Sequence, residues 1–260
     1  MNDIEVLKDL ISSFLILDLN IKLYLIDNSP TDELIDVVTD LRIEYLHNPS
    51  NVGFGAGHNI AIRKALSVGS NYHFIVNPDI YLNEDVVTPL VEYMKNNNGV
   101  GMIMPQILNL DGKVQNLPKL LPSPLSILLR KIKRPRGYYK KFIERYELRN
   151  VPQKQIYNAP ILSGCFTLLN LKAIQEIGGY DDNYFMYFED WDLSRRMHQK
   201  YRTIYYPLVS VYHGYESGAN KSLKLFKIFI YSAFIYFNKW GWFFDKERKQ
   251  INRKALSQFD

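Results

Sequence analysis

Three carboxylates that lie within four residues could carry acid–base chemistry. Glu189, Asp190 and Asp192 directly follow the aromatic run Tyr184–Phe188. A general base needs an acidic side chain in a partly dry place, and aromatic neighbours exclude water. The residues that follow predict a helix. The alternative interpretation is therefore that these carboxylates only cap its N-terminus, where the helix dipole favours anions.

A second set of polar groups suits a divalent cation. Asn77-Pro78-Asp79 follows a short apolar run, and oxygen ligands presented in this way suit Mg²⁺ or Mn²⁺ bridging a diphosphate. His213 follows the apolar run Leu208–Tyr212 and could bind the same metal or a phosphate. The alternatives are a turn with a capping aspartate and a structural histidine.

Residues 53–59 form a glycine-rich turn that could cradle a phosphate. Its glycines do not have the spacing of the dinucleotide-binding fingerprint, and no Gly-Lys-Ser/Thr follows them. The glycine cluster alone is therefore a weak indication of phosphate binding.

The elements that must position these groups alternate along the first half of the chain. Apolar runs typical of buried strands lie at residues 21–26, 43–46 and 72–76, with helical patterns between them. This alternation predicts an α/β fold with a mainly parallel central sheet flanked by helices. Ligands of such sheets bind beyond the carboxyl ends of the strands. Two strands end there in polar groups, at Asp27-Asn28 and at Asn77-Pro78-Asp79.

Composition and charge narrow the class of protein. A chain of 260 residues fits one large domain with or without a small appendage, and the single cysteine, Cys165, excludes an internal disulfide. Residues 130–149 hold nine basic and two acidic side chains, a net +7 that leaves the rest of the chain at −2. Such a patch suits nucleic acid, an anionic membrane or a phosphorylated substrate, or is simply a solvated face.

No segment has the pattern of a signal peptide or of a membrane-spanning helix. The longest apolar run, Leu225–Phe237, is short and contains Lys227. We therefore expect a cytoplasmic protein, either free or peripheral on the inner face of the cell membrane.

Short motifs follow one another in a specific order over roughly residues 4–217. They are Leu25-Ile26-Asp27-Asn28-Ser29, Asn51-Val52-Gly53-Phe54-Gly55 with His58-Asn59, Val76-Asn77-Pro78-Asp79, Ser163-Gly164-Cys165-Phe166, Gly178-Gly179-Tyr180-Asp181, Phe188-Glu189-Asp190-Trp191-Asp192-Leu193 with Arg195-Arg196, and His213. This ordered set resembles the family 2 glycosyltransferases with a GT-A fold, particularly the rhamnosyltransferase-like members of bacterial surface-polysaccharide pathways.

The resemblance implies a role for each matching position. Asp190, with Glu189 beside it, would deprotonate the acceptor hydroxyl, and the reaction would be a single inverting displacement that releases a nucleoside diphosphate. Asp79 and His213 would bind the metal, Mg²⁺ or Mn²⁺. The nucleotide sugar would be held by Asp27, Asn28, Gly53, Asn59, Asn77 and Gly164, with Asn77 in the place of the first aspartate of a DXD-type motif.

The N-terminus departs from the family pattern. Members begin with a hydrophobic strand that ends in a Thr-Tyr-Asn-like segment, whereas Met1-Asn2-Asp3 runs straight into the first helix. We therefore expect the first strand of the fold to be missing, with an open seam in the sheet and unpaired backbone groups along it. The start could be set too late, the enzyme could be trimmed, or another segment could fill the gap.

We expect two parts, a GT-A domain at residues 1–217 and C-terminal aromatic and basic helices at 218–260. Residues 118–152 would be a basic insertion that could be mobile. The aromatic and basic C-terminal residues suit a helix in a membrane interface, or alternatively a helical pair packed on the catalytic domain. The expected contacts with the acceptor or the membrane are Arg134, Lys140 and Trp240.

The resulting hypothesis is an inverting transferase of O-antigen or capsule-type polysaccharide synthesis. Its expected donor is deoxythymidine-diphosphate-rhamnose, with a UDP-sugar as the alternative. Its expected acceptor is a lipid-linked saccharide at a membrane surface. Nucleic acid is not an expected partner, and the oligomeric state is not predicted. The competing hypothesis is an N-terminally truncated, inactive binding or scaffold protein. Nucleotidyl transfer is disfavoured because no glycine-rich, Arg/Lys-bearing triphosphate loop lies near the N-terminus.

Overall fold

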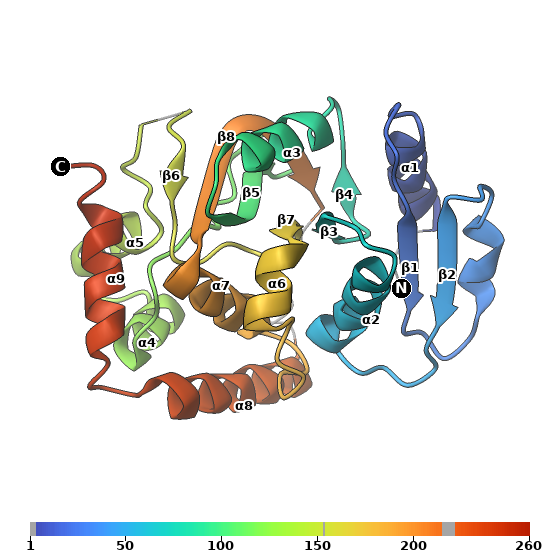
Figure 1. The fold of residues 1–260 in the computed structure, drawn as a ribbon. Helices are drawn as coiled ribbons and strands as arrows, with labels where there is room; N and C mark the ends of the chain where they lie inside the picture. The colour runs from blue at the N-terminus through green and yellow to red at the C-terminus, as the bar shows by residue number, and fades with distance from the viewer. Residues whose placement is uncertain (1–3, 153, 215–221) are drawn as a thin grey trace.

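A computed structural model describes residues 4–152, 154–214 and 222–260 of the chain (Figure 1). The expected start at residues 1–3 and the expected domain boundary at 217/218 lie outside the described residues. The helices are α1 (Ile4–Leu15), the 3₁₀ helix η1 (Glu33–Val37), α2 (Phe54–Ser67), α3 (Val87–Asn96), α4 (Pro124–Ile132), α5 (Arg136–Tyr146), α6 (Leu171–Ile177), α7 (Glu189–Lys200), α8 (Leu223–Trp240) and α9 (Lys246–Leu256). The strands are β1 (Leu23–Asp27), β2 (Ile43–His47), β3 (Tyr72–Val76), β4 (Ile80–Tyr81), β5 (Val100–Leu108), β6 (Tyr157–Asn158), β7 (Phe166–Asn170) and β8 (Arg202–His213).

The strands form two separate sheets, of which only the larger has strands in both directions. β1 and β2 form a parallel pair, and the larger sheet has the order β3-β7-β5-β8-β4 with β6 added to β8. Only the β5–β8 pair of the larger sheet is parallel, so the expectation of a mainly parallel sheet was wrong. The physical reason is that strand–helix alternation stops after β5. From there β7 returns between β3 and β5 and pairs antiparallel with both.

The expected seam lies between β1 and β3, which do not pair within the described residues. The Leu23 N–H donates to the Arg42 carbonyl at 2.8 Å, and the Asn48 N–H donates to the Asp27 carbonyl at 2.7 Å. Since backbone groups alternate along a strand, those of Tyr24 and Ile26 face away from β2, toward the unpaired edge. Within the described residues, the sheet is therefore split between β1 and β3.

Two helices join the separate sheets. On one side of α1, Leu7 and Ile11 pack with Ile43 of β2. On the other, Leu10 and Phe14 join the main core, which is centred on the buried residues of β5 and β7. α2 contacts both β1 and β3. Apolar burial against these helices thus replaces the missing ladder of hydrogen bonds.

The basic segment and the C-terminal helices both pack on the rest of the molecule. Ile143 and Tyr146 of α5 are buried in the main core. Tyr236 and Phe237 of α8 are buried against Trp191 of α7 in a second apolar cluster (Figure 1). Among the described residues, no helix combines the length and apolar character that crossing a membrane requires.

Candidate active site

The first group of site residues lies where β3 and β8 end and β4 begins. Asn77 and Asp79 flank the turn between β3 and β4, and β4 pairs with β8 so that Ile80 lies opposite His213. The Asp79 Oδ1 atom lies 3.3 Å from the His213 Nε2 atom, and the Asn77 Nδ2 atom lies 3.4 Å from that same nitrogen. The structure therefore brings the three predicted metal-side residues together.

The His213 ring is oriented by a residue that the sequence interpretation missed. The Gln115 Nε2 group donates to the His213 carbonyl at 3.1 Å, and Gln115 Oε1 lies 3.2 Å from His213 Nδ1. Gln115 is buried. A glutamine in the turn after β5 carries no recognisable signal, because only the fold places it beside a residue 98 positions later.

The side chains of Asn77, Asp79 and His213 suit a divalent cation. Burial raises the pKa of Asp79, but the hydrogen bond and charge of His213 outweigh it and hold that pKa below its usual value. The Asn77 Oδ1 atom is buried and accepts no hydrogen bond from the described residues. No three His, Cys, Asp or Glu side chains gather as a metal site in the described part of the chain. Phosphate oxygens and water would complete such a coordination sphere, as is usual for Mg²⁺.

Glu189 and Asp190 form the second group, at the start of α7. The Gly164 N–H points to Asp190 Oδ2 at a long 3.4 Å. Burial is the main cause that raises the pKa of Asp190, and the Lys119 ammonium and backbone N–H groups oppose it. Burial also raises the pKa of Glu189, together with the Asp190 charge, and the buried Glu189 Oε2 atom has no hydrogen-bond partner among the residues that the structure describes. A carboxylate that holds its proton more tightly is a stronger base.

Lys119 is a second site residue that sequence reasoning missed. Its side chain is buried, and its ammonium donates to the Leu117 carbonyl at 2.9 Å. Burial lowers the pKa of Lys119 to about 8, while the charge of Asp190 acts in the opposite direction. A lysine between apolar neighbours at residues 117–121 was the available signal.

The glycine-rich turn lets the Tyr184–Phe188 loop approach α2. Gly53 has φ +94°, and a Cβ atom there would lie 2.2 Å from the Phe185 carbonyl oxygen. The Phe54 N–H donates to that same oxygen at 3.0 Å. Gly53 is therefore required for a close approach of two backbone segments, which sets the loop that precedes Asp190.

Asn59 clamps the glycine pair that precedes the same loop. Its side chain accepts from the Tyr180 N–H at 2.9 Å, and donates to the Tyr180 carbonyl at 2.9 Å and to Asp182 at 2.7 Å. A Cβ atom on Gly179 would lie 2.4 Å from Asn59 Oδ1. The structure thus gives the Asn59 amide three partners within the protein.

Asp27 and Asn28 lie at the ends of β1 and β2. Asp27 accepts from the Ser29 N–H at 2.9 Å and from the Tyr45 hydroxyl at 2.7 Å, and Asn28 accepts from Asn48 at 2.9 Å. Burial raises the pKa of Asp27, but these donors outweigh it and lower that pKa overall. Within the described residues, no hydrogen bond links Asp27 or Asn28 to the metal-side group.

Asp192, the remaining acidic residue of the motif at residues 188–193, connects α7 to α8. Asp192 is fully buried and accepts from Arg196 at 2.8 Å and from the Trp240 indole at 2.8 Å. The Trp240 ring also lies 4.2 Å from the Arg195 guanidinium. Trp240, predicted as an acceptor or membrane contact, thus turns its indole N–H inward. Arg134 and Lys140 are exposed, just before and within α5.

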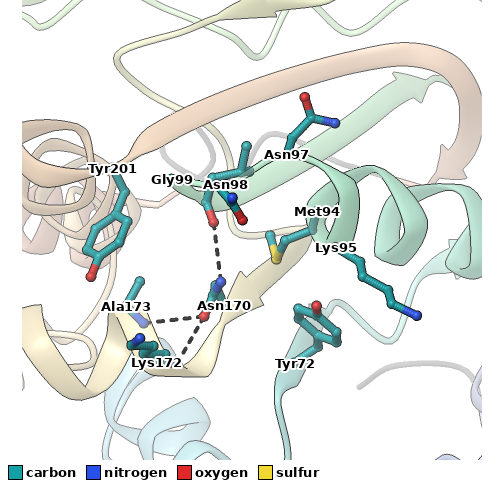
Figure 2. Close-up of a pocket in the computed structure, with 11 residues that line it drawn as sticks. Tyr72, Met94, Lys95, Asn97, Asn98, Gly99, Asn170, Lys172, Ala173 and Tyr201 are labelled. Atoms are coloured by element: carbon teal, nitrogen blue, oxygen red, sulfur yellow. Dashed lines mark hydrogen bonds between the residues drawn. The ribbon is translucent and has the colours of Figure 1, made fainter.

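A cavity of about 280 Å³ lies at the opposite end of the strands from these groups (Figure 2). It is lined by the beginnings of β3 and β5 and the end of β7. Figure 2 shows that the Asn170 side chain reaches into it, but this side chain already caps α6 and donates to the Val100 carbonyl. The predicted site residues are absent from its lining.

Comparisons with known proteins agree with the geometry. The sequence model of the family described as Glycosyl transferase family 2 matches residues 1–178. A low-salt glycan biosynthesis hexosyltransferase, Agl10 of Haloferax volcanii, is 26% identical over 174 residues, which are 66% of this chain and 51% of the relative. The N-acetylglucosaminyl-diphospho-decaprenol L-rhamnosyltransferase of Mycobacterium tuberculosis is 23% identical over 74% of this chain and 66% of its own length. The rhamnosyltransferase WbbL of Escherichia coli is 26% identical over 71% and 69%. The chain thus spans half to about two thirds of these relatives.

Solved structures show the same fold. S. aureus TarS aligns with a TM-score of 0.60 at 12% identity, over 98% of this chain and 41% of TarS. GalNAc-T7, crystallised with UDP, GalNAc and Mn²⁺, aligns with a TM-score of 0.55 at 15% identity, over 82% and 41%. These likenesses confirm the GT-A fold that the sequence motifs predicted.

Proposed function

Since the chain belongs to glycosyl transferase family 2, we propose that it is an inverting glycosyltransferase that moves a sugar from a nucleoside-diphosphate donor to a lipid-linked saccharide. The observation that supports this proposal is that the pKa values of two acidic groups are shifted in opposite directions. The pKa of Asp79 lies below its usual value beside His213, whereas burial raises the pKa of Asp190. Carboxylates whose surroundings push their pKa values apart are suited to different roles in one reaction.

Asp190 is the base in this proposal. It accepts the proton of the acceptor hydroxyl as that oxygen bonds to the anomeric carbon, and the bond from this carbon to the diphosphate breaks with inversion. Asn77, Asp79 and His213 would hold a divalent cation, Mg²⁺ or Mn²⁺, which when bound offsets the negative charge of the leaving diphosphate. Asp27, Asn28, Gly53, Asn59 and Gly164 are proposed to shape the pocket for the nucleotide sugar.

The proposed donor is deoxythymidine-diphosphate-rhamnose, with a UDP-sugar as the alternative. Two of the curated relatives are named rhamnosyltransferases, and the name of one places its acceptor on a decaprenol diphosphate. A lipid-linked acceptor in O-antigen or capsule-type synthesis would place the protein on the inner face of the cell membrane. The exposed cations Arg134 and Lys140 support an encounter with such an anionic surface.

A donor screen by thermal shift tests this assignment. We expect deoxythymidine-diphosphate-rhamnose with Mn²⁺ or Mg²⁺ to raise the Tm by roughly 5–10 °C at about a hundredfold excess over Kd, because a ligand that binds only the folded state stabilises it. Product formation is then measured with the donors that bind. If no nucleoside-diphosphate sugar raised the Tm with either metal, the proposed function would be wrong.

Asp79→Asn tests the proposed metal site at Asn77, Asp79 and His213. Loss of the carboxylate charge should remove the metal-dependent part of the donor-induced Tm shift and weaken the metal-dependent donor affinity by roughly tenfold or more. Asp111→Asn, in an exposed turn and paired with Lys113, is the control for removing one negative charge. Equal metal dependence in the two variants would argue against a metal at Asp79.

Lys119→Met tests the electrostatic control of Asp190. The Lys119 ammonium lowers the pKa of Asp190, so its removal should raise that pKa further. Because the base must be deprotonated, the acidic limb of the pH–rate profile should then move to higher pH. Lys113→Met, at an exposed turn, should leave the limb in place, and an unmoved limb in Lys119→Met would contradict the coupling.

A second candidate function is that of a binding protein with this fold, which binds a nucleotide sugar but does not transfer the sugar. The observation in its favour is that β1 and β3 do not pair within the described residues, next to the expected nucleotide site. The donor screen separates the two candidates, because a binding protein would show the Tm shift without any product.

A further inference from the structure

Helix α4 turns an apolar stripe outward. Leu125, Leu128 and Ile132 are 56%, 53% and 53% exposed, although α4 buries Leu129 on its other side. Their spacing of three and four residues places the three side chains on one face of the helix. α4 thus has apolar residues on two sides, of which only one packs against the protein.

Helix α8 has the same character. Ile230, Tyr231 and Phe234 are 38%, 64% and 52% exposed, whereas Tyr236 and Phe237 are buried. Ile230, Tyr231 and Phe234 again share one helical face, on which Lys227 also lies. Phe243 and Phe244, in the turn after α8, are also exposed, at 70% and 96%.

The two helices meet at one pair of side chains. The Lys131 ammonium lies 4.7 Å from the centre of the Phe226 ring, which joins the end of α4 to the beginning of α8. Ile127 and Phe229 pack in the same apolar cluster. In Figure 1, α8 runs along the bottom of the view with α4 beside it at the lower left. We call Leu125, Leu128, Ile132, Ile230, Tyr231 and Phe234 the apolar face.

The two helices carry basic but no acidic residues. Neither Pro124–Ile132 nor Leu223–Trp240 contains an acidic residue, and these helices carry Arg130, Lys131, Lys224, Lys227 and Lys239. Of these, Lys239 pairs with Asp181 and Asp192, and Arg130 pairs with Glu147, so the cations that count for the proposal are Lys131, Lys224 and Lys227. The exposed Lys133 and Arg134 follow α4 directly. Exposed aromatic and aliphatic side chains among lysines match the boundary between the headgroups and acyl chains of an anionic bilayer, where lysines extend toward the phosphates.

We propose that α4, α8 and the turn after α8 lie in the interface of an anionic lipid bilayer. This inference rests on the proposed function, because a lipid-linked acceptor would be presented at that interface. The apolar face is close to the base: the Phe188 and Trp191 rings, which flank Asp190, lie 5.5 Å and 6.5 Å from the Tyr236 ring on the inner side of α8. The body of α8, with Tyr236 on its inner side, and the rings of Phe188 and Trp191 would thus lie between a bilayer and the turn of Asp190.

Vesicle flotation with the full chain, without donor or acceptor, tests this docking. We expect binding to vesicles of equal parts phosphatidylglycerol and phosphatidylcholine, and at least roughly tenfold weaker binding to phosphatidylcholine alone. Ile230→Asp/Phe234→Asp should weaken binding to the anionic vesicles by at least roughly tenfold, since charged side chains are costly in an apolar interface. The matched control is Leu41→Asp/Val68→Asp, which changes two exposed apolar residues away from α4 and α8.

The charge of the surface is tested separately. Lys224→Glu/Lys227→Glu should lower affinity for the anionic vesicles by at least roughly tenfold and reduce the salt dependence of binding. Lys95→Glu/Lys172→Glu, at the cavity of Figure 2, makes the same change in net charge elsewhere and should have little effect. Circular dichroism and the Tm of each variant verify that it is folded, and Ile230→Ser/Phe234→Ser replaces the aspartate variant if that one unfolds.

Three outcomes would overturn the docking proposal. The first is equal vesicle binding by the apolar-face variant and its control, and the second is equal binding to anionic and neutral vesicles. The third is an unchanged protein that is a dimer in solution and becomes a monomer when the apolar face is mutated, which would indicate that a second copy covers the face. None of them touches the proposed function, because flotation uses neither donor nor acceptor. Conversely, a protein that binds vesicles but forms no product with any donor would contradict the transferase assignment and leave the docking intact.

Discussion

Replacing Asp190 with asparagine should reduce sugar transfer by roughly 10²–10⁴-fold, the contribution typical of a general base. Asparagine has nearly the same shape and keeps an oxygen for the Gly164 N–H, so the start of α7 should stay in place. What it loses is the ability to take the proton of the acceptor hydroxyl. Donor binding depends on other residues and should remain nearly intact.

Two measurements separate this role from a structural one. The donor-induced Tm shift of Asp190→Asn should match that of the unchanged protein, while its rate of product formation falls. Glu189→Gln is the companion variant: burial and the Asp190 charge raise the pKa of Glu189, so the neutral amide resembles its protonated form and should retain much more activity. Equal rates in Asp190→Asn and the unchanged protein would remove the base assignment.

The acidic limb of the pH–rate profile gives a further check on Asp190. Burial raises its pKa above the usual value for aspartate, which is about 4. The base is inactive when protonated, so the rate should already fall in mildly acidic solution. A rate that stayed constant down to about pH 4 would contradict a buried carboxylate as the base.

Replacing Arg195 with leucine should destabilise the protein by about 3–5 kcal/mol, which lowers the Tm by on the order of 10 °C. Arg195 is 1% exposed and donates to both oxygens of the buried Asp245, at 2.8 and 2.9 Å, and to Glu247 at 2.8 Å. Breaking a buried ion pair from one side leaves the partner charge without compensation. Arg248, 3.7 Å from Asp245, moderates this loss.

Matched variants test the Arg195 argument by denaturant unfolding. Arg63→Leu changes an exposed arginine on α2 and should alter the free energy of unfolding by less than about 0.5 kcal/mol. Arg195→Met/Asp245→Asn removes both charges while the introduced asparagine can still cap α9, and it should be more stable than Arg195→Leu. If Arg195→Leu behaved like Arg63→Leu, the brace between α7 and α9 would not stabilise the fold.

The local part of the site could be predicted from the sequence. Asn77-Pro78-Asp79 and Glu189-Asp190 are contiguous motifs, and a strand end or helix start positions such groups through hydrogen bonds between near neighbours. The order of the motifs then identified the family before any geometry was known.

The direction of the strands could not be predicted in the same way. The run at residues 166–170 reads as a strand, but its pattern is the same whether it pairs parallel or antiparallel. Only tertiary packing placed β7 between β3 and β5 in the opposite direction. The same limit applies to Gln115 and Lys119, whose importance depends on residues far away in the chain.

The fold family and the two acidic motifs follow from the sequence, because each depends on residue types at short spacing. The contacts of those residues follow only from the tertiary packing. It turned Trp240 inward onto Asp192, left the outer stripes of α4 and α8 exposed, and gave Asp79 and Asp190 surroundings that shift their pKa values in opposite directions. Burial and electrostatic interactions depend on everything that surrounds a group in space, and neighbours in space are mostly distant in sequence.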